Sequence, residues 1–457
     1  MNSLCALRLP KGHSSLRESR SIDIIDCLQL PHTVVWHPIR TTDEAFEAIK
    51  AMKIRGAPAI ASLAALAIAC ELMSILDNPQ DPILMTGANL RAWLEDRSNY
   101  LLHSRPTAVN LREAMHRLVA IAAATEEPSD TVLRAQKVVN AAELVWIEDV
   151  DRNTKIGDNG ATWLLQKLER AGAIKKEEKI NVLTVCNTGS LATSGYGTAL
   201  GVITSLHRME RLAHAFYAQT GPYQQGARLT SLELQSQSIP STMVCDTAIA
   251  SLLSGNAGKR NIHAFILGAD RIAANGDTAN KISSYQIALL ARHVPPPHGK
   301  HRTQTLICAP VATFDLDMET GSHIVIEERP SWEACTVRGK VYHHSPNAKA
   351  ATSEATVASS QQVAGHAHVK VDGHQEKVDV VTVLITPEGT QAWNPAFDVV
   401  PAELTDGIAC ELGVVEKGGN SVFDLRRYVK QSGPPKPPAK EWREAEKAGG
   451  ANGVHEQ

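Results

Sequence analysis

Residues 180–189, INVLTVCNTG, place a short apolar run directly before a polar turn that ends in glycine. The same order, an apolar run followed by a polar turn and a helical pattern, recurs at Ala213–Ala218, Thr242–Val244, His263–Leu267 and Thr305–Cys308. Alternating buried strands and helices are typical of βαβ units, so this part of the chain predicts a parallel sheet. Ligands bind such sheets at the carboxyl ends of the strands. Residues just after the runs, Cys186 and Asp270 among them, are therefore candidates for function.

The chain before residue 150 has a different pattern, which predicts helices at Thr42–Met52, Ala59–Leu76, residues 108–125 and residues 130–148. Residues 21–39 alternate enough to suggest a few short strands. We therefore predict an α/β fold. Residues 1–150 form a mainly helical N-terminal domain with a few short strands, and residues 151–430 form a Rossmann-like domain with a parallel sheet.

Two segments are predicted to lie outside this framework. Residues 338–378 are rich in Ala, Ser, His, Gln and Lys and interrupt a strand pattern that resumes at Val380, which predicts an inserted mobile loop. Residues 431–457 are rich in Pro, Gly and charged residues and predict a disordered tail.

Composition argues against several classes of function. The chain of 457 residues has 46 Lys and Arg against 49 Asp and Glu, so it lacks the basic excess that nucleic-acid binding requires. Apolar runs stay below the roughly 18 residues of a membrane span, and no secretory signal pattern begins the chain. Its 8 cysteines form no CxxC pair and no zinc-binding spacing. We expect a cytoplasmic protein with reduced thiols and no bound metal.

Two segments combine an arginine with the start of a helix. In Arg55-Gly56-Ala57-Pro58, small residues lead into a helix whose first position suits Pro58. Ser104-Arg105-Pro106-Thr107 repeats this arrangement ahead of a helix that begins near Ala108. A helix N-terminus and a guanidinium both favour an anion. Two ordinary proline-started helices with solvated arginines are the alternative.

Cys186 ends the first apolar run and precedes a predicted small-residue helix, Ser190–Leu206. A thiol at a helix N-terminus can have a lowered pKa, which would make it reactive. A buried structural cysteine is the competing interpretation.

Asp270 ends the apolar run Ile266-Leu267-Gly268-Ala269. A carboxyl group at the apolar end of a strand can have its pKa raised enough to act as an acid at neutral pH. A helix N-cap or an ion pair with Arg271 would explain the same residue structurally.

These motifs and several others occur together in the order of a known family. They are Arg55-Gly56-Ala57-Pro58-Ala59-Ile60, Cys186-Asn187-Thr188-Gly189-Ser190, Gln225-Gly226-Ala227-Arg228-Leu229-Thr230, Gly268-Ala269-Asp270-Arg271-Ile272, Asn275-Gly276-Asp277, Asn280-Lys281-Ile282 and Asn394-Pro395-Ala396-Phe397-Asp398. From about residue 20 to residue 430 the sequence resembles the methylthioribose-1-phosphate isomerases of methionine salvage, and its insertion and tail resemble the longer fungal members.

The resemblance implies a reaction, a fold and a site. The reaction is the aldose–ketose isomerisation of 5-methylthio-α-D-ribose 1-phosphate to 5-methylthio-D-ribulose 1-phosphate, with neither metal nor cofactor. The implied assembly is a homodimer, and the implied location is the cytoplasm, with the nucleus left open. The implied catalytic residues are Asp270 and Cys186. The residues implied to bind the phosphosugar are Arg55, Gly56, Ala57, Arg105, Gln225, Asn280 and Lys281.

The expected chemistry follows from the substrate. Because the 1-phosphate locks the sugar ring, an acid must help to open it, and a protonated Asp270 would donate to the ring oxygen. Cys186 would then assist hydrogen transfer between C2 and C1, by an enediol route or a hydride shift. Arg55, Arg105 and the helix N-termini would neutralise the phosphate.

Two alternatives share the fold. A ribose-1,5-bisphosphate isomerase would need a second phosphate pocket. A regulatory subunit, like the alpha, beta and delta subunits of translation initiation factor 2B, would need no catalytic Cys and Asp. The chain also departs from the family in having Gln219-Thr220-Gly221-Pro222 where Glu-Thr-Arg-Pro is expected, which removes a cation from the expected site.

Overall fold

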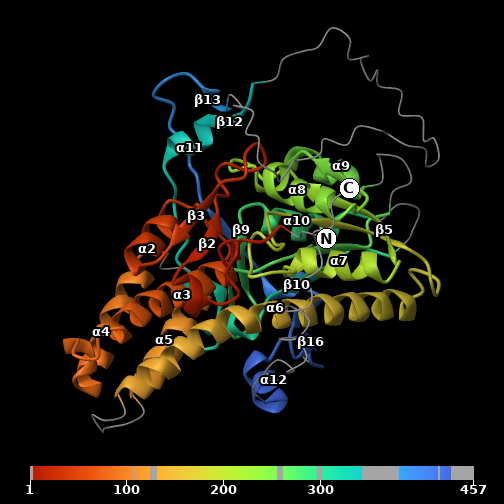
Figure 1. The fold of residues 1–457 in the computed structure, drawn as a ribbon. Helices are drawn as coiled ribbons and strands as arrows, with labels where there is room; N and C mark the ends of the chain where they lie inside the picture. Colours follow the sequence, from red (N-terminus) through yellow and green to blue (C-terminus); the bar gives the residue numbers. More distant parts are fainter. Residues whose placement is uncertain are drawn as a thin grey trace, which may run out of the picture.

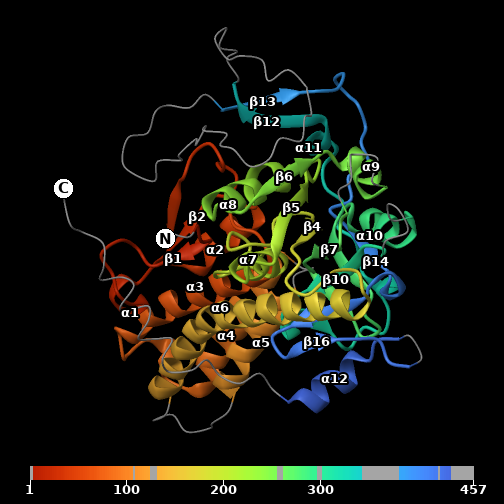
Figure 2. The same cartoon turned by 90° about the vertical axis from the view of Figure 1, so that its right-hand side faces the viewer.

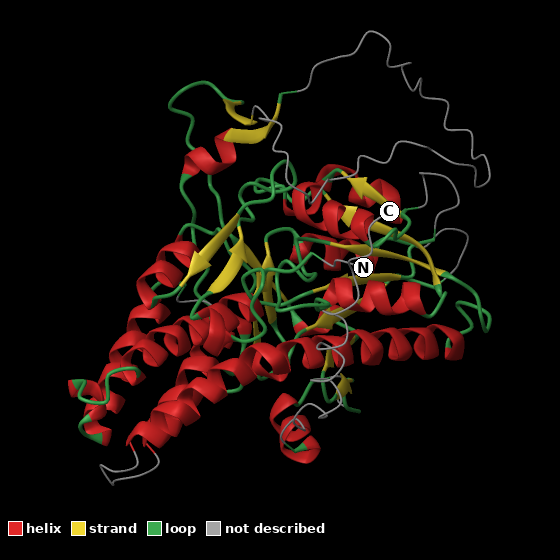
Figure 3. Cartoon of the chain, in the orientation of Figure 1, coloured by secondary structure: helices red, strands yellow, loops and turns green. Residues whose placement is uncertain are grey.

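The computed structural model describes residues 4–105, 109–123, 131–254, 261–295, 301–341, 380–419 and 422–433 of the chain. A helical half and a sheet-containing half lie side by side, and one long helix runs along both (Figure 1; Figure 3). Most of the predicted insertion and nearly all of the predicted tail lie outside the described residues.

The N-terminal half combines a small sheet with a layer of helices. The sheet is antiparallel, in the order β1 (Leu7–Arg8), β2 (Ile22–Ile25) and β3 (Trp36–Ile39). The helices are α1 (Leu16–Ser19), α2 (Thr42–Lys50), α3 (Ala57–Leu76), α4 (Gly87–Leu102), α5 (Val109–Ala123) and α6 (Thr131–Arg170). The predicted helices and the strands near residues 21–39 are therefore present, although α6 continues far beyond residue 148.

Helix α3 is the centre of this half. Its length and its mean hydropathy of 2.2 would suit a membrane span, but 78% of the apolar window is buried inside the protein. The helix packs against α5 and α6, and its small residues allow close approach. Burial in the core accounts for its composition.

Helix α6 crosses the predicted boundary between residues 150 and 151 without a break. Its first half contributes Val138 and Val145 to the core of the helical half, and its second half contributes Ile156 and Leu164 to the core below the large sheet. The two predicted domains therefore share this helix.

The large sheet has the order β16-β15-β10-β7-β4-β5-β6. Its parallel strands are β4 (Ile180–Thr184), β5 (Leu212–Ala218), β6 (Ser241–Val244), β7 (Ala264–Leu267), β10 (Gln304–Cys308) and β15 (Gly407–Cys410), and β16 (Gly413–Val415) pairs antiparallel at one edge. From β4 the chain builds β5 and β6 on one side and then returns to place β7 on the other. The strand order thus reverses between β4 and β7, which is where ligands bind in open α/β sheets.

Helices cover both faces of this sheet (Figure 2). The helices of the C-terminal half are α7 (Ala199–Arg208), α8 (Ser231–Ser236), α9 (Ile249–Leu253), α10 (Ser284–His293), α11 (Ser331–Cys335) and α12 (Leu425–Ser432). A second sheet joins β11 (Phe314–Asp315), β8 (Arg271–Ala273), β9 (Thr278–Lys281) and β14 (Phe397–Val400). The paired strands β12 (Thr336–Lys340) and β13 (Val380–Leu384) project from the body with α11 (Figure 1).

Two predicted boundaries differ from the structure. Residues 338–340, assigned to the inserted loop, belong to strand β12. The predicted helix Ser190–Leu206 is wrong in its first half, because residues 190–198 form an irregular loop and α7 begins only at Ala199. Gly197 has a φ of +92°, and a Cβ there would lie 2.4 Å from the Cα of Gly189, so the loop folds back on itself.

Candidate active site

Cys186 and Asp270 follow the two strands between which the sheet order reverses. Cys186 lies two residues beyond the end of β4, and Asp270 lies three residues beyond the end of β7. Because β4 and β7 are hydrogen-bonded neighbours, both residues emerge at the same place on the carboxyl edge. They therefore lie together, as their positions at strand ends predicted.

The backbone of Cys186 is held in a conformation that side-chain-bearing residues rarely adopt. Its φ is +70°, a left-handed value that costs roughly 1–2 kcal/mol. Its N–H donates to the Thr220 hydroxyl at 3.0 Å, and its carbonyl accepts a hydrogen bond from the Thr230 hydroxyl. Two anchors thus hold the thiol in place.

The cation beside the Cys186 thiol is Arg55. Its Nη2 lies 3.5 Å from Sγ of Cys186, and its Nη1 donates to Oδ1 of Asn187 at 3.3 Å. The expected helix N-terminus is not there, because α7 starts at Ala199. The positive charge nearest the thiol therefore comes from a side chain of the helical half, and Lys281 of the sheet half interacts with Cys186 electrostatically.

Gly56 allows Arg55 to come this close. Gly56 has a φ of +94°, and a Cβ there would lie 2.1 Å from the carbonyl oxygen of Ala192. Only glycine fits this crossing of two chain segments. Helix α3 then begins at Ala57, so Pro58 takes the second helical position. The sequence had predicted the first position for it.

Asp270 is a carboxyl group whose pKa is raised. Burial is the main cause, and the positive charges of Lys281, Arg105 and Arg55 oppose it. The structural alternatives are not supported, because Asp270 precedes strand β8 rather than a helix and Arg271 forms an ion pair with Asp315 at 3.4 Å. Asp270 thus has the environment expected of an acid.

Asn280 and Lys281 end strand β9 and are both buried. Burial lowers the pKa of Lys281 to about 8, and Cys186 and Asp270 partly offset this effect. Its Nζ donates to the carbonyl of Ala396 at 2.8 Å and lies 4.6 Å from the ring centre of Phe397. The Asn280 amide donates to the Ser284 hydroxyl at 2.9 Å.

Arg105 approaches the same aromatic ring. Its guanidinium carbon lies 5.9 Å from the ring centre of Phe397, and its Nε lies 3.6 Å from a carboxylate oxygen of Glu327. The predicted helix start at residues 106–108 lies outside the described residues.

Another arginine, Arg329, lies near the turn that contains Gly221, where the resemblance led us to expect an arginine. Arg329 pairs with Glu327 at 2.9 Å and donates to the hydroxyl of Tyr223 at 3.3 Å. Glu327 therefore connects Arg329 with Arg105. Gly221 itself donates its N–H to Asp246 at 2.7 Å.

Several polar atoms around this region are buried without a hydrogen-bond partner among the described residues. They are Nε of Arg55, both amide atoms of Gln225, and Nε of Arg105, whose contact with Glu327 is an ion pair at 3.6 Å. Gln225 is 1% exposed, so its amide is closed off from solvent as well. Because unsatisfied buried polar groups are costly, their presence here is typical of a site that a polar ligand completes.

A small cavity of about 40 Å³ lies where these segments meet. Six of the nine predicted site residues line it: Arg55, Gly56, Ala57, Cys186, Asp270 and Asn280. Arg105 and Lys281 act on Asp270 electrostatically from outside the lining. The cavity has room for little more than one water molecule.

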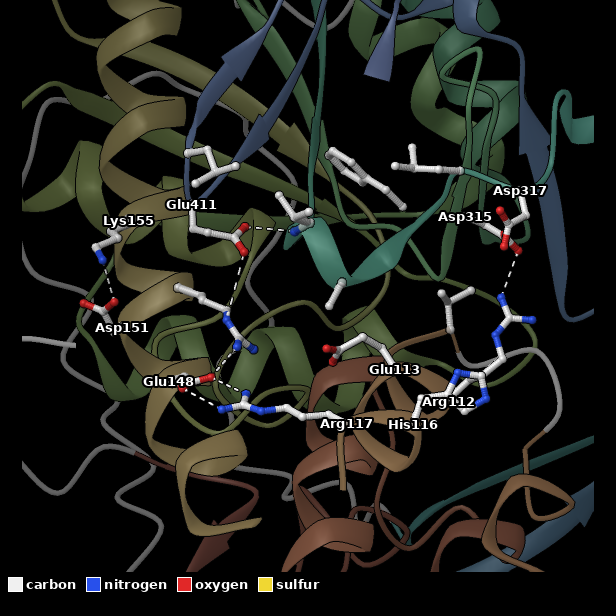
Figure 4. A pocket seen from close by; sticks show the side chains of 17 residues that line it. Arg112, Glu113, His116, Arg117, Glu148, Asp151, Lys155, Asp315, Asp317 and Glu411 are labelled. Carbon is white, nitrogen blue, oxygen red and sulfur yellow. Dashed lines mark hydrogen bonds and ion pairs between the residues drawn. The ribbon is translucent and has the colours of Figure 1, made fainter. Parts of the chain in front are cut away.

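A larger cavity of about 780 Å³ lies between α5, α6 and the chain beyond β10 and β15 (Figure 4). It contains none of the predicted site residues and is lined by ion pairs, including Arg117 with Glu148 and Arg112 with Asp315. Its charges are thus largely neutralised by one another. Glu411 in this lining also has a pKa raised by burial, but its carboxylate accepts the N–H of Val311 at 2.9 Å and lies 4.0 Å from Arg152. The smaller cavity instead brings the Cys186 thiol and the Asp270 carboxyl group together with Arg55, so it is the better candidate for chemistry.

Sequence reasoning missed several residues that build this site. Thr220 and Thr230 hold Cys186, Glu327 contacts Arg105, and Phe397 lies beside two cations. Phe397 and Thr230 stand inside recognised motifs, so a signal existed for them. Glu327 stands in no motif and could be found only from the fold.

Comparisons with known proteins show the family of the chain. Residues 53–417 match the initiation factor 2 subunit family. The methylthioribose-1-phosphate isomerase of Postia placenta is 44% identical over 423 residues, which cover 92% of this chain and 100% of that protein. The protein of the same name from Aspergillus fumigatus is 41% identical, and the match covers 88% of this chain and 94% of that protein.

Solved structures show the same fold. The 5-methylthioribose 1-phosphate isomerase of Pyrococcus horikoshii has a TM-score of 0.66 and 27% identity, and the match covers 94% of this chain and 96% of that one. The translation initiation factor eIF-2B subunit delta of A. fulgidus has a TM-score of 0.61 and 28% identity, with coverage of 91% and 96%.

Proposed function

This chain belongs to the methylthioribose-1-phosphate isomerases within the initiation factor 2 subunit family, and we propose that it converts 5-methylthio-α-D-ribose 1-phosphate to 5-methylthio-D-ribulose 1-phosphate in methionine salvage. It is an enzyme, an aldose–ketose isomerase. The observation that carries the residue assignment is the meeting of Arg55, Cys186 and Asp270 around one cavity.

Asp270 is the proposed proton donor. Burial raises the pKa of its carboxyl group and so favours the protonated form. Opening the ring of the substrate breaks the bond between C1 and the ring oxygen, and that oxygen must receive a proton. Asp270 supplies it, and C1, which keeps its phosphate on the anomeric oxygen, is left as an electron-deficient oxocarbenium centre that can accept hydrogen.

Cys186 is the proposed partner in hydrogen transfer from C2 to C1. In the enediol route, a base removes the C2 proton and returns a proton to C1. In the hydride route, the C2 hydrogen moves with its electron pair to C1 and the thiol stabilises the transition state. In both routes the C2 hydroxyl gives its proton to the Asp270 carboxylate left by ring opening, which restores the acid. The two routes differ in exchange with solvent, so deuterium at C1 of product formed in D₂O identifies the enediol route and its absence the hydride shift.

The cations and the N-terminus of α3 are proposed to hold the 1-phosphate. Arg55 precedes the first turn of α3, and Arg105 and Lys281 contribute positive charge around Asp270. Nε of Arg55, which lines the cavity, and Nε of Arg105 lack hydrogen-bond partners among the described residues and offer donors for phosphate and hydroxyl oxygens. The Gln225 amide, which does not line the cavity, is proposed to reach the substrate when the site opens. Phe397, with Arg105 and Lys281 near its ring, shields this side of the site from water.

Substrate binding must enlarge the site. A cavity of about 40 Å³ is smaller than a phosphosugar, and its walls come from the helical half (Arg55–Pro58) and the sheet half (Cys186–Thr188). We propose that these two walls separate to admit the substrate and close over it, which excludes water during the reaction.

Turnover of the purified protein on 5-methylthioribose 1-phosphate tests the proposal. Product from the wild type, and strong impairment of the folded Cys186→Ser and Asp270→Asn variants, are the expected results. A folded wild type without turnover would refute the assignment and point to the Gly221 substitution or to a regulatory role. Ribose 1,5-bisphosphate, assayed in parallel, tests the rival isomerase.

We also propose a homodimer located in the cytoplasm. Three exposed apolar side chains on α11 and on the chain that follows β13 support self-association: Trp332, Ile385 and Trp393. Light scattering of the purified protein should give twice the chain mass of 49.3 kDa.

A further inference from the structure

Glu233 is a buried carboxyl group on helix α8 that no part of the proposed mechanism uses. It is 1% exposed, and it faces the chain segment that follows Cys186. Its Oε2 accepts hydrogen bonds from the backbone N–H of Ser190 at 2.6 Å and from the Ser190 hydroxyl at 2.8 Å. Its Oε1 accepts from the Asn187 amide at 2.8 Å.

The turn is shaped around this carboxyl group. A Cβ on Gly189 would lie 2.1 Å from Oε2 of Glu233, so only glycine lets the chain and the carboxyl group approach each other. An ionisable group buried to this extent is costly unless its hydrogen bonds are complete, and here they are made by one short segment. Stability alone would be served by an apolar residue.

The contact with Asn187 decides how that amide is oriented. Oε1 of Glu233 accepts from the backbone N–H of Leu191 at 3.4 Å, so it faces the NH₂ group of Asn187 and not its oxygen. The amide oxygen of Asn187 is thereby turned to the other side, where it accepts from Nη1 of Arg55 at 3.3 Å. The other guanidinium nitrogen, Nη2, then lies 3.5 Å from Sγ of Cys186. If the amide were flipped, two donors would face each other and Arg55 would be pushed away.

We propose that Glu233 is a positioning residue for the isomerase reaction: through Asn187 it holds the guanidinium of Arg55 against the Cys186 thiol. The effect on catalysis rests on the proposed function, and the effect on the position of Arg55 rests on the contacts described above.

Burial raises the pKa of Glu233 to about 7, and hydrogen bonds from Ser190, Leu191 and Asn187 oppose this rise. A protonated Oε2 would donate to the Ser190 hydroxyl, whose own hydrogen could then go to the carbonyl of Leu4. Oε1 accepts the hydrogen bond from the Asn187 amide whether Glu233 is ionised or protonated on Oε2.

The test compares three variants in kinetics and in crystal structures. Glu233→Met, which keeps the length of the side chain but offers Asn187 no acceptor, should lower kcat for 5-methylthioribose 1-phosphate at least tenfold, and the distance from Arg55 to Sγ of Cys186 should grow by more than 1 Å. Asn187→Ala should do the same. The double variant should be no slower than the slower single variant, because both act through one amide.

Ser190→Ala is the matched control. It removes a hydroxyl partner of Glu233 and leaves the bond to Asn187, so kcat should stay within threefold of the wild type. Should Glu233→Met fail to fold, Asn187→Ala supplies both readouts. An unchanged Arg55 position with unchanged kcat in the folded variants, or equal losses in Ser190→Ala, would overturn the proposal. The crystallographic distance needs no turnover, so it judges this inference even if the wild type proves inactive on the substrate.

Discussion

The guanidinium of Arg55 lies 3.5 Å from the thiol of Cys186, although 131 positions separate the two residues in the chain. One residue comes from the helical half and the other from the parallel sheet. The contact exists because Gly56 crosses the chain at Ala192 and because Cys186 adopts a left-handed backbone conformation. The site is therefore assembled only when both halves are folded and docked.

Replacing Asp270 with Asn removes the proposed proton donor while keeping the shape of the side chain. We expect kcat to fall by about 10²- to 10⁴-fold, because general acid catalysis contributes about that much. Asp277→Asn is the control, since that carboxylate accepts hydrogen bonds from the N–H groups of Gly321 and Ala402 and lies away from the cavity. Asp277→Asn should lower the melting temperature and leave kcat nearly unchanged; the reverse pattern would contradict the assignment.

Gly56→Ala should disrupt the approach of Arg55 to the thiol. A Cβ would lie 2.1 Å from the Ala192 carbonyl, and the φ of +94° adds strain. We expect kcat/KM to fall at least tenfold, as measured in initial-rate assays. Gly12→Ala is a matched control, because Gly12 has a φ of +88° and no atom lies within 4 Å of the position that a Cβ would take there. Equal effects of the two changes would show that backbone strain, and not the contact, matters.

The alkaline limb of the activity profile should report on Lys281. Burial lowers its pKa to about 8, so the ammonium needed for phosphate binding is lost as the pH rises through that value. We expect kcat/KM to fall above about pH 8. Lys281→Arg stays charged, so its limb should move to higher pH. If kcat/KM of Lys281→Arg falls at the same pH as that of the wild type, the fall is caused by another group, such as Asp270.

Lys281→Met should increase stability at neutral pH. The folded-state pKa of about 8 lies below the usual lysine value of 10.5, so the unfolded state binds more protons between these two values. Wild-type stability therefore rises with pH across that window, and the buried charge is most costly below it. Urea unfolding should show a gain of about 3 kcal/mol for Lys281→Met at pH 7 that shrinks toward about pH 10. A gain independent of pH would contradict this account.

Thr220→Val should weaken the hold on Cys186. The Thr220 hydroxyl accepts the N–H of Cys186 at 3.0 Å, and valine leaves that buried donor unsatisfied. We expect kcat to fall about tenfold, in proportion to a lost interaction of about 1–3 kcal/mol. Thr220→Ser keeps the hydroxyl and should retain most of the activity in the same assay. Comparable losses in both variants would instead implicate the methyl group.

Local pattern was sufficient for some of this fold and site. The apolar runs predicted the parallel strands, and the ends of those strands led to Cys186 and Asp270 because position relative to a strand end is a local property. The helix predicted at Ser190–Leu206 failed because its small residues serve a loop with positive φ at Gly195, Tyr196 and Gly197. Contacts between segments far apart in the chain leave no local sequence pattern, so the sequence alone does not indicate the role of Glu233.

The length of α6 was missed for a related reason. Residues 149–155 are mostly polar, and apolar positions resume only at Ile156, yet the helix continues to Arg170. Glycine has a low helix propensity, so Gly157 argues locally against a continuous helix. A Cβ there, however, would lie 2.9 Å from the carbonyl oxygen of Gly201. The glycine permits close packing of α6 on α7, and tertiary contact outweighs local preference.

Helix α6 also bears on how the protein unfolds. With 40 residues it spans about 60 Å, and its side chains complete two separate hydrophobic cores. Cutting the chain at residue 150 would leave each fragment with half a helix and an uncovered apolar groove. The two halves should therefore melt in one cooperative transition rather than two, and the enzyme cannot be divided at that point into fragments that fold alone.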